Sequence, residues 1–126
     1  MATAIIYTSK LGSTKKVAEF IASKIGAEAI QLSDTTDPSK YDRIILGSGV
    51  YAGKVSKKMR NFIESHKDQL KNASLFVCCI FGDEKGAKQL EKISESTGIA
   101  DAIFFDSPKD QISGKKKKLE EYIESL

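Results

Sequence analysis

The stretch Ala4-Ile5-Ile6-Tyr7-Thr8-Ser9-Lys10-Leu11-Gly12-Ser13-Thr14 (residues 4–14) passes from an apolar run through a polar turn into a helical pattern. The run shows no polar alternation, which is typical of a strand buried on both faces of a sheet. From Val17 onward apolar residues recur at helical spacing, and Gly26 follows as a helix-ending residue. The stretch therefore predicts a strand, a turn and an amphipathic helix.

The same alternation continues along the chain. Further apolar runs lie at residues 29–32, 44–46, 75–81 and 102–105, and helical patterns lie at residues 55–70, 87–93 and 119–126. Strands that alternate with helices form a parallel sheet joined by right-handed crossovers. The sequence therefore predicts an α/β fold, doubly wound in three layers, with a five-stranded parallel sheet in the order 2-1-3-4-5.

Size and composition narrow the class of protein. A chain of 126 residues, 40% hydrophobic and 29% charged, has room for one globular domain spanning residues 1–126. No apolar run is long enough to insert into a membrane, and the first residues show no secretory signal, so we expect a cytoplasmic protein. Two adjacent cysteines, Cys78 and Cys79, are expected to fill the core, and the single histidine, His66, to lie at a surface or boundary position. Demanding chemistry must then come from a bound cofactor or from hydroxyls and backbone amides.

The loops after the first and third strands are the candidate ligand site. In a doubly wound sheet, ligands bind at the carboxyl ends of the strands, where the strand order reverses. Residues 8–14 place four hydroxyl side chains and Gly12 just before a helix, whose first N–H groups attract anions. This pattern predicts a phosphate site, and a second interpretation, in which Ser13 or Thr14 is only a helix cap, stays open.

The pattern Thr8-Ser9-x-x-Gly12-Ser13-Thr14 resembles the phosphate loop of flavodoxins, which hold the 5′-phosphate of FMN. Residues 41–54, YDRIILGSGVYAGK, look like the third strand and first flavin loop of the flavodoxin-like branch that includes menaquinone-dependent protoporphyrinogen oxidase. Residues 80–83, IFGD, stand where flavodoxins begin their second flavin loop. The resemblance implies a flavodoxin-like fold and FMN as the cofactor.

The same resemblance implies which residues contact the cofactor. The phosphate would be surrounded by Thr8, Ser9, Lys10, Leu11, Gly12, Ser13 and Thr14. The isoalloxazine would lie along Ser48, Gly49, Val50, Tyr51, Ala52 and Gly53, with Tyr51 packed on its face, and Phe81 and Gly82 would begin the second flavin loop. A glycine peptide that changes orientation near flavin N5 is a family feature, and Gly53 or the Ala52–Gly53 peptide is the candidate here.

Two features depart from the family pattern. The second flavin loop offers only Phe81 as an aromatic residue, which predicts one open flavin face. The first flavin loop is followed at once by four cations, Lys54, Lys57, Lys58 and Arg60. Cations near the flavin would raise its potential and attract an acidic redox partner protein or a small carboxylated substrate.

Other ligand classes fit less well. Gly47-x-Gly49-x-x-Ala52 has the spacing of a dinucleotide fingerprint, yet it follows the third strand and lacks the later acidic residue. The region also falls short of a nucleotide P-loop, and Thr8-Ser9-Lys10 replaces the acids of a receiver domain. The run Lys115–Lys118 has no interleaved aromatic residue, so we expect a solvated helix face and no nucleic acid.

The sequence therefore favours a short-chain flavodoxin, a monomeric flavoprotein that binds FMN and transfers one or two electrons between redox partners. Two alternatives remain open. One is an FMN-dependent oxidoreductase resembling protoporphyrinogen oxidase, and the other is a flavodoxin-fold interaction module without flavin.

Overall fold

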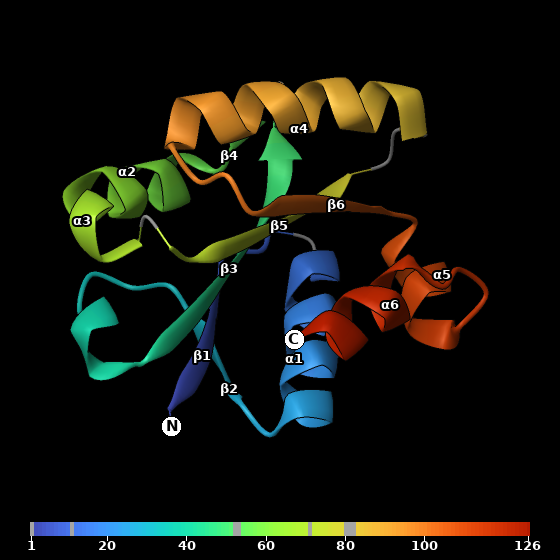
Figure 1. Ribbon diagram of the computed structural model, residues 1–126, viewed down its shortest axis with the longest axis horizontal. Coiled ribbons are helices and arrows are strands. Elements are labelled where there is room, and N and C mark those ends of the chain that lie inside the picture. Colours follow the sequence, from blue (N-terminus) through green and yellow to red (C-terminus); the bar gives the residue numbers. More distant parts are fainter. Residues whose placement is uncertain (1, 11, 52–53, 71, 80–82) are drawn as a thin grey trace.

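A parallel sheet organises the computed structural model, which describes residues 2–10, 12–51, 54–70, 72–79 and 83–126. Within these residues its strands are β1 (Thr3–Tyr7), β2 (Glu28–Gln31), β3 (Arg43–Tyr51), β5 (Ser74–Cys79) and β6 (Ala102–Asp106), in the order β2-β1-β3-β5-β6. A short strand, β4 (Lys54–Val55), pairs antiparallel with the end of β3. When only the parallel strands are counted, the predicted order 2-1-3-4-5 is confirmed (Figure 1).

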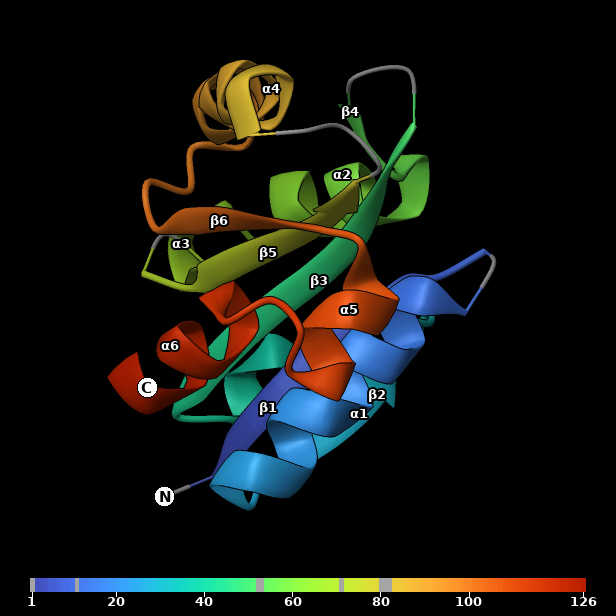
Figure 2. The ribbon, with the colours of Figure 1, turned by 90° about the vertical axis from the view of Figure 1, so that its right-hand side faces the viewer.

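Helices cover both faces of the sheet, as Figure 1 and Figure 2 show. One face carries α1 (Ser13–Ile25), α5 (Pro108–Ser113) and α6 (Lys118–Ser125), whereas the other carries α2 (Lys57–Ser65), α3 (Lys67–Leu70) and α4 (Asp83–Thr97). A short 3-10 helix, η1 (Pro38–Lys40), lies between β2 and β3. The three layers confirm the doubly wound α/β prediction.

The hydrophobic core has two halves, one on each face of the sheet. Ile5 and Tyr7 of β1 pack with α1, whereas Ala4 and Ile6 belong to the half under α2 and α4. Successive strand residues point to opposite faces. Because both faces are covered, both sets of side chains must be apolar, which explains the absence of alternation in these runs.

The predicted helix over residues 55–70 begins later, at Lys57, because Val55 belongs to β4, and it is divided into two helices. The backbone leaves the helical conformation at His66 (φ −128°, ψ 33°), and α3 restarts at Lys67 so that Leu70 reaches the core. The His66 ring packs against Phe62 at 4.9 Å, and its Nδ1 lies 3.0 Å from Gln69 Oε1. His66 is half-buried, which confirms the predicted boundary position.

The lysine run differs from the expected solvated helix face. Helix α6 begins at Lys118, so the first three lysines precede the helix. Lys116 forms an ion pair with Asp106, and Lys117 Nζ lies 3.5 Å from Glu120 Oε2. Lys118 Nζ lies 3.4 Å from the ring centroid of Phe104. The prediction was wrong about Lys116 and Lys118, which are half-buried, because α5 turns the chain back against the edge strand β6.

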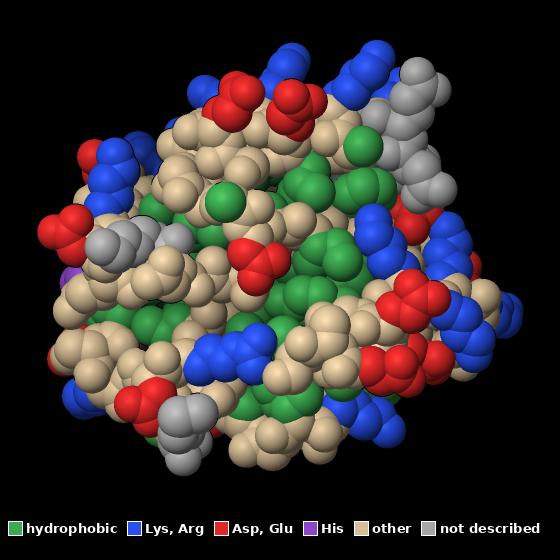
Figure 3. Space-filling view, viewed as in Figure 1, with side chains coloured by type: hydrophobic (Ala, Val, Ile, Leu, Met, Phe, Trp, Pro, Cys, Tyr) green, Lys and Arg blue, Asp and Glu red, His purple; other side chains and the backbone are tan. Residues whose placement is uncertain are grey.

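Hydrophobic side chains reach the surface between α4 and the α5–α6 end of the molecule (Figure 3). The edge strand β6 lies in this region, and its residues Ala102 and Ile103 are half-buried. The cation of Lys118 covers the Phe104 ring beside them.

Within the described residues, no helix has both the length and the apolarity needed to span a membrane.

Replacing Tyr122 by Phe is expected to stabilise the protein by about 1 kcal/mol. The Tyr122 hydroxyl is buried close to the Ser74 hydroxyl but forms no well-aligned hydrogen bond with a described residue, and its ring packs edge-on against Phe105 at 5.7 Å. Burial raises the pKa of Tyr122 to about 12. The unfolded phenol ionises near its usual pKa of about 10, so stability is lost as the pH rises from about 10 to 12.

Urea unfolding of the parent and of Tyr122→Phe at pH 8 and pH 11 measures both the gain in stability and its dependence on pH. The advantage of the variant is expected to be larger at pH 11, because phenylalanine has no proton to lose. A variant less stable than the parent at both pH values would show that the hydroxyl has a stabilising partner.

Candidate functional site

The turn between β1 and α1 leaves the start of α1 without a side-chain cap. Gly12 precedes the helix with φ 89°, a left-handed conformation that a side chain would strain, and its N–H donates to Ser9 Oγ at 3.0 Å. The first N–H groups of a helix have no partner within the helix. The first turn also has no acidic residue. The N-terminus of α1 therefore keeps its donors and its positive dipole available for an anion.

Three of the predicted phosphate hydroxyls lie beside this helix start. Ser9 is half-buried, Ser13 is exposed, and Thr14 is buried with 3% of its surface exposed. Lys10 is exposed and brings a positive charge to the same loop. Leu11 lies outside the described residues. The arrangement fits a phosphate group, which accepts hydrogen bonds from amides and hydroxyls and carries negative charge.

The predicted contacts Thr8 and Ser48 form an internal hydroxyl network with Ser56. Thr8 Oγ1 lies 2.7 Å from Ser56 Oγ and donates to Ser48 Oγ at 3.3 Å. Ser56 N donates to Ser48 Oγ at 3.0 Å, while Ser56 Oγ accepts from Met59 N and so caps α2. This network fastens the ends of β1 and β3 to the start of α2, so Thr8 and Ser48 position the two loops.

The predicted first flavin loop is mostly a β-hairpin. Strand β3 continues through Ser48, Gly49 and Val50 to Tyr51, and then pairs back with β4 through Val50–Val55 and Tyr51–Lys54. Ala52 and Gly53, including the predicted flexible peptide, lie outside the described residues. A side chain at Gly49 would meet the Tyr51 hydroxyl at 2.8 Å, so Gly49 leaves the space that the tyrosine occupies.

Tyr51 links the hairpin to the phosphate turn. Its ring is half-buried, and Lys10 Nζ lies 5.0 Å from the ring centroid. This contact brings together one residue predicted to contact the phosphate and one predicted to pack on the isoalloxazine. The other predicted ring contacts, Phe81 and Gly82, lie outside the described residues.

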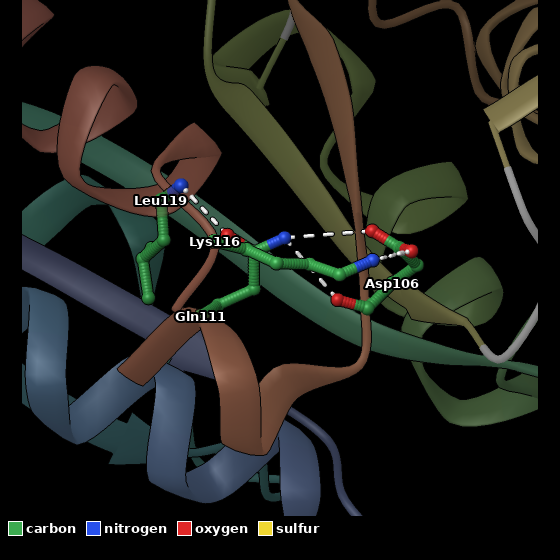
Figure 4. Close-up of polar contacts among 4 residues, drawn as sticks. All are labelled: Asp106, Gln111, Lys116 and Leu119. Atoms are coloured by element: carbon green, nitrogen blue, oxygen red, sulfur yellow. Dashed lines mark hydrogen bonds and ion pairs between the residues drawn. The ribbon is translucent and has the colours of Figure 1, made fainter. Parts of the chain in front are cut away.

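A polar cluster at the carboxyl end of β6 holds the start of the last helix, α6, in place (Figure 4). Gln111 is 1% exposed, and its Nε2 donates to the Asp106 carbonyl at 3.2 Å while its Oε1 accepts from Leu119 N at 3.0 Å. Lys116 forms an ion pair with the Asp106 carboxylate. The cluster joins β6, α5 and α6, so it has a structural role beside the candidate site.

Replacing Gln111 by Ala is expected to destabilise the protein by about 3 kcal/mol, because buried groups of Asp106 and Leu119 lose their partner. Urea unfolding measures the loss. The variant Gln111→Met separates hydrogen bonding from volume, since it fills the space without polar atoms. A Gln111→Met protein as stable as the parent would contradict a stabilising role for these hydrogen bonds.

Sequence reasoning missed Ser56 and the Asp106 cluster. Ser56 stands directly before an amphipathic helical pattern, and this cap position was a usable signal. Pro108, the first residue of α5, was a similar signal for a helix start after β6. The contacts themselves join residues far apart in sequence, such as Thr8 and Ser56, and no local pattern reveals them.

Comparison with known proteins agrees with this architecture. A family model described as flavodoxin domain matches residues 4–108. No curated protein sequence matches the chain.

Three similar solved structures show the fold. A flavoprotein in complex with FMN from Lactobacillus acidophilus NCFM has a TM-score of 0.66 and 21% identity, covering 89% of this chain and 98% of that one. A flavodoxin from the domain Archaea has a TM-score of 0.63 and 18% identity, and the match covers 99% of this chain and 98% of that one. A short-chain flavodoxin associated with a non-canonical PDU bacterial microcompartment has a TM-score of 0.64 and 13% identity, covering 100% and 97%. Since the family model spans most of the chain, the protein belongs to the flavodoxin domain family.

Proposed function

We propose that this protein binds FMN non-covalently at the carboxyl edge of its sheet and carries one or two electrons between redox partners. The observation that carries the proposal is the uncapped N-terminus of α1, which has no acidic residue in its first turn and lies beside the hydroxyls of residues 9–14. Membership of the flavodoxin domain family and the similar structure in complex with FMN support it.

The residues of the phosphate turn have distinct proposed roles. The backbone N–H groups at the start of α1 and the hydroxyls of Ser9, Ser13 and Thr14 would hold the phosphate, with Lys10 adding positive charge. Thr8 and Ser48 would keep the turn in place through their bonds to Ser56. Leu11 completes the proposed turn.

The hairpin has the proposed role of lining the flavin ring. Tyr51 would pack against it, with Gly49 and Val50 alongside and Ala52, Gly53, Phe81 and Gly82 as further contacts. When bound, FMN supplies the one- and two-electron chemistry, while the protein sets its potential through hydrogen bonds and local charge. The cations Lys10, over the Tyr51 ring, and Lys54, paired with Tyr51 across the hairpin, would raise that potential.

The charge of this region also indicates the kind of redox partner. Lys54, Lys57, Lys58 and Arg60 follow the hairpin and favour a partner protein with an acidic surface. A flavin-dependent oxidoreductase acting on a carboxylated substrate is the second candidate, favoured by the same cations. The likeness of residues 41–54 to protoporphyrinogen oxidase remains a sequence resemblance, since none of the three similar structures belongs by name to that enzyme.

Electron transfer from the reduced, FMN-loaded protein to ferricyanide tests the carrier proposal. Stopped-flow traces are expected to show electron transfer whose rate falls as salt is added, because the acceptor is an anion and the region is cationic. A rate that rises with salt would contradict the charge assignment, and reduced protein that transfers no electron would contradict the carrier role.

A further inference from the structure

A cleft of about 410 Å³ lies between the β1–α1 turn, the end of β2 and the start of α2. Four cations line it, Lys10, Lys57, Lys58 and Arg60, and no described acidic residue does. We call it the cationic cleft. It falls within the usual size range of small-molecule sites, about 300–1,000 Å³.

In the described part of the chain, the cations of the cleft have no acidic partner. Among the described residues, none of the four takes part in an ion pair. Arg60 Nε donates to the Val55 carbonyl at 3.2 Å, which holds the side chain against the cleft. Walls of a single charge focus the electrostatic potential inside a cleft. An anion in the cleft would therefore relieve repulsion among these side chains.

The walls of the cleft are also apolar and aromatic. Leu32 and Val55 line it and are almost fully buried, and the Tyr51 ring forms another part of the wall. The exposed part of the Tyr51 ring gives a flat organic body a favourable surface, which inorganic phosphate would leave in contact with water. The lining therefore favours an organic anion over a simple inorganic one.

The cleft differs from the proposed phosphate position. No residue of the first turn of α1 lines it. Helix α1 packs on one face of the sheet, whereas α2, which supplies three of the four cations, packs on the other. Among the described residues, the cleft and the proposed flavin site share Thr8, Ser9, Lys10 and Tyr51.

We propose that the cationic cleft is a second binding site, for a planar organic dianion of the aromatic dicarboxylate class. The carboxylates pair with the three cations of α2, Lys57, Lys58 and Arg60, and the ring packs against the part of Tyr51 that lines the cleft. This site adjoins the proposed flavin site, with which it shares Lys10 and Tyr51, and the three cations of α2 distinguish it from that site.

Calorimetric titration of the purified protein with naphthalene-2,6-dicarboxylate tests this proposal. One saturable site is expected, and its affinity should fall as salt is added. Two matched probes separate the contribution of the carboxylate charges from that of the aromatic ring. Adipate has the charges without the ring, and naphthalene-2,6-dimethanol has the ring without the charges. Each is expected to bind at least about tenfold more weakly. Adipate that binds as well as the aromatic probe would overturn the proposal in favour of a purely electrostatic surface for an acidic partner.

Two matched pairs of substitutions test whether the cations of α2 form the binding site. Lys57→Gln with Lys58→Gln is expected to weaken the dicarboxylate at least about tenfold and to leave FMN affinity within about twofold. Lys88→Gln with Lys92→Gln removes the same charge from exposed positions on α4 and is expected to change neither. Equal weakening by both pairs would overturn the proposal. Because FMN affinity is measured separately, failure of the flavin proposal gives a different result.

Discussion

Replacing Ser13 by Asp is expected to weaken FMN binding at least about a hundredfold, which corresponds to about 2.7 kcal/mol. Ser13 is the first residue of α1, and the helix has no acidic residue in its first turn. A carboxylate there would repel the phosphate of FMN and compete for the same N–H donors. Fluorescence titration with FMN measures the change.

The same substitution is expected to stabilise the protein without FMN by about 0.3–1 kcal/mol, because a negative charge at a helix N-terminus complements the dipole. Opposite effects on binding and stability distinguish a ligand site from a structural cap. Ser13→Ala is the matched control and should weaken FMN far less, since it removes one hydroxyl without adding charge. Unchanged FMN affinity in Ser13→Asp would contradict the assignment of the phosphate to this helix.

Replacing Gly47 by Ala is expected to destabilise the protein by about 3 kcal/mol. Gly47 lies in β3 beside β5, and a Cβ there would lie 2.2 Å from Phe76 Cζ. Phe76 is fully buried and packs against Phe105 at 6.1 Å, so its ring cannot move without disturbing the core. Urea unfolding measures the loss.

A double variant shows whether the clash between the new Cβ and Phe76 causes the loss of stability. Gly47→Ala combined with Phe76→Leu is expected to be more stable than the sum of the two single changes indicates, because leucine vacates the tip of the ring. Gly26→Ala is the control, since a Cβ there meets nothing within 4 Å and only the backbone strain at φ 69° remains. If the two losses of stability simply add in the double variant, the clash with Phe76 is not the cause of the loss in Gly47→Ala.

The fold was predictable from the sequence because its central strands are buried on both faces. The apolar run at residues 102–105 corresponds closely to β6, and the run at residues 4–7 to β1. The run at residues 44–46, however, underestimates β3, which extends to Tyr51. Glycine usually indicates a break in a strand, but Gly47 is here because Phe76 fills the place of a side chain.

The site was predictable only where a local pattern defines it. The helix start after Gly12 follows from adjacent residues, and the structure contains it. The hairpin was missed because pairing between Tyr51 and Lys54 depends on backbone geometry that glycine-rich sequence leaves open. The network of Thr8, Ser48 and Ser56 was missed because its members come from three elements that only the fold brings together.

The central claim is that this chain binds FMN at the uncapped start of α1. Titration of FMN with the purified protein, followed by flavin fluorescence, tests it most directly. We expect a saturable change that ends at one FMN per chain and is largely lost in Ser13→Asp. A signal that never saturates would contradict the claim and leave the chain as a flavodoxin-fold protein that does not bind flavin.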